Sequence, residues 1–150
     1  MKRILTTAIA LTTVPVMMVW AGALLLQVGK ADAHPEAKKM NAVLVATSTA
    51  CHEPGKSVVT ASYVQRNGDG VRRMPLKVVP LDTAGTFAVL GDVPAGSLID
   101  LAVTNPEYKN YQPRVLIRTD SRGVAWGSVR RFFSTAPTEG DVRGMLALVD

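Results

Sequence analysis

The two histidines of the chain, His34 and His52, are its best candidates for metal chemistry. His34 follows Ala31-Asp32-Ala33, which has small residues at the two positions that a signal peptidase reads. Cleavage after Ala33 would give His34 a free amine beside its imidazole, and His52 could supply a third nitrogen. Nitrogen donors of this kind suit Cu(II). The main expectation is that the protein has no cofactor and that His52 lies in a polar loop. Copper binding by His34 and His52 is the alternative hypothesis.

Arginines gather in the second half of the sequence. Arg114, Arg118, Arg130 and Arg131 lie in segments that are predicted to be strands, so adjacent strands could present one basic face. Such a face favours a negatively charged partner, either another protein or an anionic glycan or envelope surface. The competing interpretation is a solvated strand face with ion pairs to residues such as Asp100, each worth less than about 1 kcal/mol when exposed.

Other functional classes find little support in the residues. The net charge of +5 is mild, and the chain lacks the concentrated basic residues with interleaved aromatics that are typical of nucleic-acid binding. No serine lies in a Gly-x-Ser-x-Gly elbow, and no Walker-type phosphate loop is present. Most carboxylates lie in predicted turns, so no acid pair can be nominated for glycoside hydrolysis. The sequence predicts a protein that is not an enzyme and does not bind nucleic acid.

The N-terminus carries an export pattern. Residues 4–28 are uncharged and mostly apolar, directly behind Lys2 and Arg3, so residues 1–33 are predicted to be a signal peptide that is cleaved after Ala33. Because about 20 apolar residues suffice to cross a bilayer as a helix, the alternative is an uncleaved anchor that contacts the membrane through residues 4–28. The first reading makes the protein periplasmic or secreted. The second makes it membrane-anchored, with its domain outside the cytoplasm.

Residues 34–150 are predicted to form one β domain. Short segments rich in Val, Leu, Ile, Phe and Tyr alternate with turn formers such as Asp82-Thr83-Ala84-Gly85 and Asp120-Ser121-Arg122-Gly123. We expect an all-β fold, an antiparallel β-sandwich of seven or eight strands after an N-terminal apolar helix. The segments read as strands are residues 42–47, 58–64, 76–81, 86–90, 98–104, 114–119, 124–133, with a bend at Gly127, and 145–149.

Alternation assigns the core face of one strand, and composition limits the role of the cysteine. Ile99, Leu101 and Val103 share one face of their segment, so they are predicted to point into the core. Trp126 is expected to lie in the core as well. Cys51 is the only cysteine, so it cannot form a disulfide within this domain, and it is buried, free or paired with another chain.

One stretch resembles a known family. Asp82-x-x-Gly85-x-Phe87, then Val93-Pro94-Ala95-Gly96, an alternating strand and Tyr108 resemble the carboxypeptidase regulatory-like domains, which are transthyretin-type sandwiches, over about residues 57–111. The segment 118–125 is similar to the strand-turn-strand of bacterial immunoglobulin-like domains. These families mostly serve adhesion, carbohydrate contact or support of neighbouring domains. The resemblance implies a non-catalytic binding or structural module and transfers no site residues.

Overall fold

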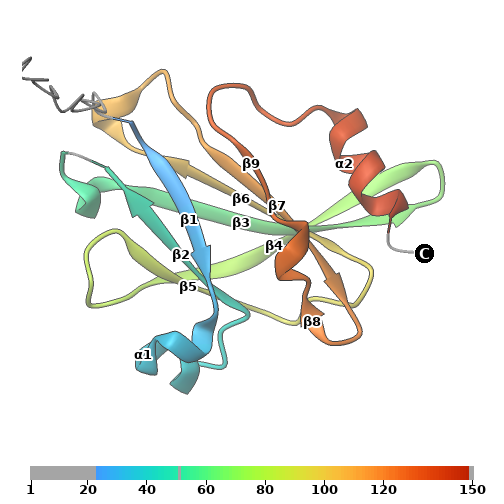
Figure 1. The fold of residues 1–150 in the computed structure, drawn as a ribbon, viewed down its shortest axis with the longest axis horizontal. Helices are drawn as coiled ribbons and strands as arrows, with labels where there is room; N and C mark the ends of the chain where they lie inside the picture. Colours follow the sequence, from blue (N-terminus) through green and yellow to red (C-terminus); the bar gives the residue numbers. More distant parts are fainter. Residues whose placement is uncertain (1–22, 51, 149–150) are drawn as a thin grey trace, which may run out of the picture.

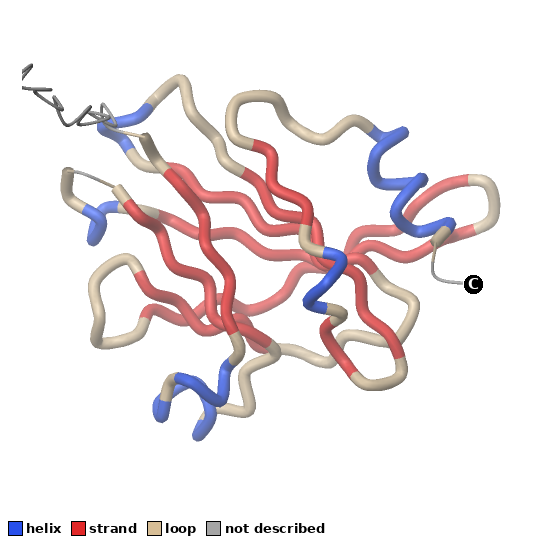
Figure 2. Tube along the Cα trace, in the orientation of Figure 1, coloured by secondary structure: helices blue, strands red, loops and turns tan. Residues whose placement is uncertain are grey.

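The computed structural model describes residues 23–50 and 52–148, which form nine β-strands and two α-helices. The strands dominate, and the helical turns lie around them (Figure 2). The strands are β1 Leu25–Gly29, β2 Leu44–Thr49, β3 Val58–Asn67, β4 Gly70–Pro80, β5 Thr86–Leu90, β6 Leu98–Thr104, β7 Arg114–Asp120, β8 Gly123–Val124 and β9 Arg130–Phe132. The helices are α1 Pro35–Lys39 and α2 Glu139–Ala147, with short 3-10 helices η1 Ala31–Ala33, η2 Pro54–Lys56, η3 Pro106–Tyr108 and η4 Trp126–Ser128.

All strand pairs are antiparallel and belong to one continuous sheet in the order β1-β2-β5-β4-β3-β6-β7-β8, with β9 also paired to β7. The sheet curls into a half-barrel (Figure 1). The expected all-β antiparallel fold is confirmed. The described residues form nine strands, whereas seven or eight were expected. These strands form one curled sheet, whereas a sandwich has two sheets.

Strand β4 carries the chain from one half of the curl to the other. Its residues 70–76 pair with β3, and its residues 77–80 pair with β5. Next to this changeover, Gly91 has a φ of 143°, and a Cβ there would lie 2.7 Å from Leu76 Cδ2. A residue without a side chain is therefore needed where the end of β5 approaches β4.

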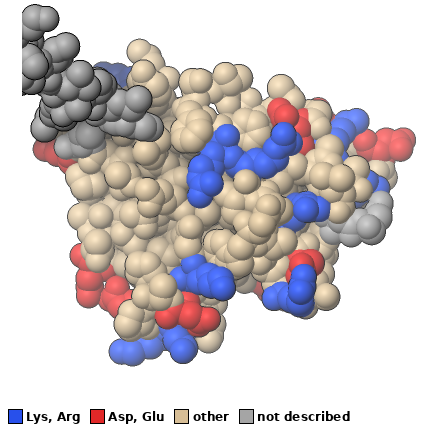
Figure 3. Space-filling view, in the orientation of Figure 1, with Lys and Arg blue, Asp and Glu red and all other residues tan. Residues whose placement is uncertain are grey.

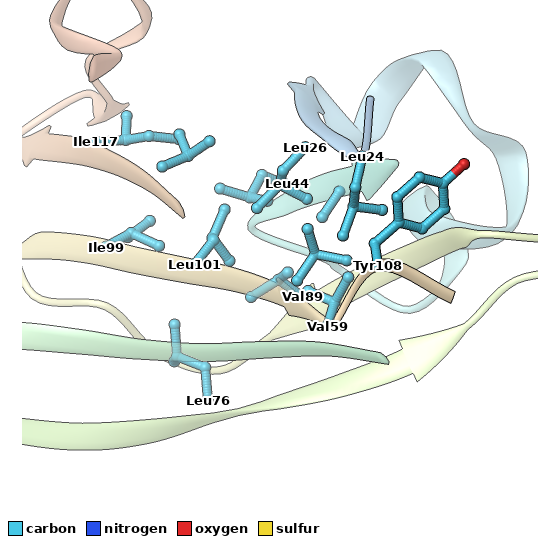
Figure 4. Packing of buried hydrophobic residues seen from close by; sticks show 13 residues of the cluster. Leu24, Leu26, Leu44, Val59, Leu76, Val89, Ile99, Leu101, Tyr108 and Ile117 are labelled. Atoms are coloured by element: carbon cyan, nitrogen blue, oxygen red, sulfur yellow. The ribbon is translucent and has the colours of Figure 1, made fainter. Parts of the chain in front are cut away.

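The concave face of the sheet holds the main core (Figure 4). Ile99, Leu101 and Val103 are fully buried there, as their alternation predicts, and Trp126 packs against the cluster while staying partly exposed. The buried members of this cluster are Leu24, Leu26, Leu44, Ala46, Val59, Leu76, Val89, Ile99, Leu101, Val103, Tyr108, Val115 and Ile117. They come from both halves of the curl, so closing the sheet on itself removes the apolar face from water.

The N-terminal apolar run contributes a strand to this fold. Residues 25–28 of the run lie in β1, which pairs with β2 from Leu25 opposite Thr49 to Gly29 opposite Val45. Leu24 and Leu26 are only 2% and 3% exposed. The expected apolar helix is thus wrong for residues 25–28, while residues 4–22 lie outside the described part of the chain. No helix within residues 23–50 and 52–148 is long and apolar enough to span a bilayer.

Residues 145–147 are helical, as the end of α2, where residues 145–149 were expected to be a strand; residue 149 lies outside the described part of the chain. The helix begins with a capping box: Asp141 N–H donates to Thr138 Oγ1 at 3.1 Å, and Thr138 N–H donates to Asp141 Oδ2 at 2.8 Å. Val142, Met145 and Leu146 follow at helical spacing and are buried. They cover Val64, Leu98 and Leu116 on the outer face of the sheet. This spacing of i, i+3, i+4 favours a helix, because a helix places all three side chains on one face, whereas a strand would place Met145 on the face opposite the other two.

The two Asp-x-x-Gly turns and the bend at Gly127 are confirmed. Gly85 and Gly123 both adopt positive φ, at 75° and 103°, and each lies in a turn between paired strands. Asp120 Oδ1 accepts from Arg122 N–H at 2.7 Å, which is the local cap that such a turn uses. The predicted strand 124–133 is interrupted by η4, so it appears as β8 and β9 on either side of the bend.

We expect loss of the capping box to destabilise α2. Replacing Thr138 with Ala removes an N-cap acceptor, at a cost of about 1 kcal/mol in the free energy of unfolding. Hydrogen bonds from Thr138 hold the pKa of Asp141 below its ordinary value of 3.8, and the charge of Arg130 acts in the same direction. Because this folded-state pKa is lowered, the contribution is present above the ordinary value and is lost as pH falls through the folded pKa.

Urea unfolding of the wild type and of Asp141→Asn from pH 2 to pH 7 tests this. The difference in stability between them is expected to be full above about pH 4 and to shrink below it. A difference that stays constant down to pH 2 contradicts the assignment. Gly140→Ser, in the same turn but outside the box, is the control.

Candidate binding groove

The two histidines lie at opposite ends of the β1–β2 pair. His34 follows the end of β1 at Gly29, and His52 follows the end of β2 at Thr49, which is opposite the start of β1. Each residue of a strand spans about 3.3 Å, so the ladder alone holds the two regions more than about 10 Å apart. The structure therefore does not bring His34 and His52 together around one ion. Among the described residues, no three His, Cys, Asp or Glu side chains form a cluster suited to a metal, and Cys51 lies outside that part of the chain.

The predicted arginine face is brought together only in part. Arg114 and Arg118 alternate with Val115 and Ile117, so they point to the outer side of β7, and Arg130 is opposite Leu116 on the same side. Arg131 is opposite Val115, so the register places it on the other side of β9. A band of Lys and Arg crosses the middle of the face seen in Figure 3, over the region of β7 and β9.

Arg114 is engaged with a buried carboxylate. Asp100 on β6 has a side chain that is only 1% exposed, and it pairs with Arg73 from β4 and Arg114 from β7. The Arg114 Nε–H donates to Asp100 Oδ1 at 3.2 Å, while both guanidinium groups reach Oδ2. A buried charge is stable only when it is paired and hydrogen-bonded. This ion pair, which sequence reasoning expected to be exposed, holds three strands together across the outer face.

Arg118 is engaged with the end of α2. Its Nη1 donates to the Leu148 carbonyl oxygen at 2.6 Å, where the unpaired carbonyls of a helix C-terminus attract cations. Two of the four arginines of the predicted patch thus contact the folded chain itself, Arg114 through Asp100 and Arg118 through the Leu148 carbonyl oxygen.

A groove of about 580 Å³ lies where the two edges of the sheet approach each other. One wall comes from η1, just after the edge strand β1, and the other from the β7–β8 hairpin at the opposite edge. The lining residues are Lys30, Ala31, Asp32, Ala42, Val43, Gly91, Asp92, Val93, Thr119, Arg122, Gly123, Val124 and Trp126. The groove is therefore the open seam of the half-barrel.

Trp126 is the one aromatic residue in this lining. Its ring packs partly against the main core and partly faces solvent. A second recess of about 390 Å³, which Arg118 and Ser128 help to line, also uses Arg122, Val124 and Trp126. Since both hollows share these residues, the surface around Trp126 is recessed on two sides of the β7–β8 hairpin.

Cations lie on both walls of the groove. Lys30 is exposed and makes no ion pair in the described part of the chain. Arg122 contacts Asp120 at 3.5 Å, but its side chain is 91% exposed, and such a pair contributes little. Asp32 and Asp92 are also exposed in the lining, so the groove offers two cations, two hydrogen-bond acceptors and one indole face.

Sequence reasoning did not identify this groove. It placed Lys30 inside the predicted leader, took Arg122 as part of a turn, and assigned Trp126 to the core. The signal that could have found it is the short distance in sequence between a turn cation at Arg122 and an aromatic residue just before the bend at Gly127. The wall formed by η1 comes from long-range pairing, which no local pattern reveals.

No known protein family, curated protein or solved structure matches this chain.

We expect the ion pairs of Asp100 to show an asymmetry in stability. Replacing both Arg73 and Arg114 with Ala leaves a buried carboxylate without a partner, which costs about 3–5 kcal/mol. Asp100→Ala leaves two arginines that can reach water, so its cost is smaller, about 1–3 kcal/mol. Adding Asp100→Ala to the double arginine variant should therefore restore part of the lost stability.

Urea unfolding at neutral pH measures these differences. Arg72→Ala, an exposed neighbour on β4, is the matched control and should change the free energy of unfolding by less than about 0.5 kcal/mol. If Asp100→Ala lowers the free energy of unfolding more than the double arginine variant does, the buried Asp100 carboxylate does not need its arginine partners, and this prediction is wrong.

Proposed function

We propose that this chain is an exported, non-catalytic binding module that holds an acidic glycan in the groove around Trp126. The observation that carries the proposal is that one groove is lined by a partly exposed indole ring, Trp126, and by two exposed cations from segments far apart in the sequence, Lys30 and Arg122.

The chemistry of the lining suits a sugar that carries carboxylate or sulfate groups. The indole face of Trp126 offers a flat apolar surface with negative π density, against which the C–H bonds of a sugar ring can pack. Lys30 and Arg122 can pair with the acidic groups of such a sugar. Asp32 and Asp92 can accept hydrogen bonds from sugar hydroxyls.

The surroundings of the groove carboxylates favour binding over hydrolysis. A glycoside hydrolase needs one carboxyl group kept protonated by an apolar pocket. Asp32 and Asp92 are instead exposed at the rim, in the setting of a solvated hydrogen-bond acceptor. Export is supported by Lys2 and Arg3 ahead of the apolar run, and extracellular glycans are ligands that an exported module would meet.

Trp126→Ala should weaken the binding of an acidic oligosaccharide by about tenfold or more, because a Trp at the centre of a site commonly contributes over 1 kcal/mol. Lys30→Ala and Arg122→Ala should each give a smaller loss and a weaker dependence of affinity on salt. Calorimetric titration with a sulfated or uronic-acid oligosaccharide at low and high salt measures both effects.

Arg72→Ala supplies a matched control, since it removes an exposed cation on β4 that does not line the groove. Circular dichroism is used to check that each variant remains folded. Equal affinity for a neutral oligosaccharide would show that the cations do not select the ligand. Binding that is indifferent to Trp126, Lys30 and Arg122 alike would overturn the proposal.

A further inference from the structure

The sequence holds a second pair of small residues at signal-peptidase spacing, Ala21-Gly22-Ala23, ten residues before Ala31-Asp32-Ala33. The stretch between Arg3 and this motif is residues 4–20, uncharged throughout. That is closer to the usual length of a signal h-region, about 7 to 15 residues, than residues 4–28 are. The upstream motif also has a neutral centre and neutral flanks, whereas the downstream motif contains Asp32 and directly follows Lys30.

The residues directly after the upstream motif belong to the core and the sheet. Leu24 is 2% exposed and belongs to the main core, and β1 starts at Leu25. Ala23 is partly exposed, so the change from surface to core occurs across the Ala23–Leu24 bond. Figure 4 shows Leu24 and Leu26 beside Leu44 among the buried side chains of the main core.

Removal of residues 1–33 would take β1 out of this fold. The loss would expose the edge of β2 along five register positions, Leu25–Thr49 through Gly29–Val45. It would also withdraw Leu24 and Leu26 from the core. An exposed, apolar edge strand is an aggregation hazard that stable domains avoid. A cut before Leu24 leaves β1, the η1 wall and Lys30 in the mature protein.

We infer that the export peptidase hydrolyses the Ala23–Leu24 bond, so that the mature chain begins at Leu24. Water adds across the peptide bond, which leaves a carboxylate on Ala23 and an ammonium on Leu24. The inference rests on the proposed export. It removes the free amine that a copper site at His34 requires, because His34 then lies within the chain, where its N–H donates to the Ala31 carbonyl oxygen at 3.0 Å.

Intact mass and N-terminal sequencing of the protein exported by a bacterial host test this cleavage site. The expected mature N-terminus is Leu24. A mature N-terminus at His34 would overturn the inference while leaving export intact. Retention of residues 1–23 on the translocated protein would overturn it as well and would identify the anchored form.

Two matched substitutions separate the motifs. Ala23→Arg places a bulky charge at the position before the cut, so we expect the precursor to accumulate at least tenfold over wild type. Ala33→Arg makes the same change at an exposed residue of η1, and we expect normal processing. The reverse pattern would contradict the inference. Titration of the purified mature chain with the acidic oligosaccharide is scored separately, so a failure of glycan binding is distinguishable from a wrong cleavage site.

Discussion

A single β-sheet has to bury its apolar face against itself in this protein, and most other features follow from that constraint. A flat sheet would leave the side chains of the main core in water, since α1 and α2 pack on other clusters and neither covers the concave face. The long pair β3–β4 and the changeover of β4 from β3 to β5 bend the sheet. The edge strand β1 then reaches across toward β6. Leu24 and Leu26 complete the core from that edge, which makes β1 part of the domain.

The outer face is stabilised differently on each half of the curl. On the β2–β5 half, Ala37 of α1 packs on Val45 and Ala88. On the β3–β6–β7 half, α2 covers Val64, Leu98 and Leu116 but leaves Asp100 beyond its reach. There the guanidinium groups of Arg73 and Arg114 cover the carboxylate and join β4, β6 and β7. Long arginine side chains can cover a strand face while keeping contact with water. The two arginines therefore cover the part of the outer face that no described helix covers.

The parts of the fold that depend on local pattern were predictable from the sequence. The bounds of β5 and β6, the inward face of β6 and both Asp-x-x-Gly turns follow from alternation and turn chemistry, which act over a few residues. The assignments at the two ends of the chain failed because apolar residues there fit two structures. Leu25–Gly29 reads as the end of a membrane-type run until its pairing with β2 is known, and 145–149 reads as a strand unless the capping box at Thr138 is noticed. The groove was unpredictable because its walls are far apart in sequence.

The position of the groove also bears on the polar ligand that we propose for it. β1 and β8 are the two ends of the sheet order and do not pair with each other, while η1 after β1 and the turn before β8 line the same groove. Each sheet edge carries backbone N–H and C=O groups that no strand partner satisfies. The shortness of β8, only two residues, limits how well a second chain could pair along that edge. In the proposed site, the side chains of Trp126, Lys30 and Arg122 suit a ligand with separate hydroxyl and acidic groups better than an extended strand. The incomplete closure that leaves the half-barrel open is thus the feature that forms the groove of the proposed binding site.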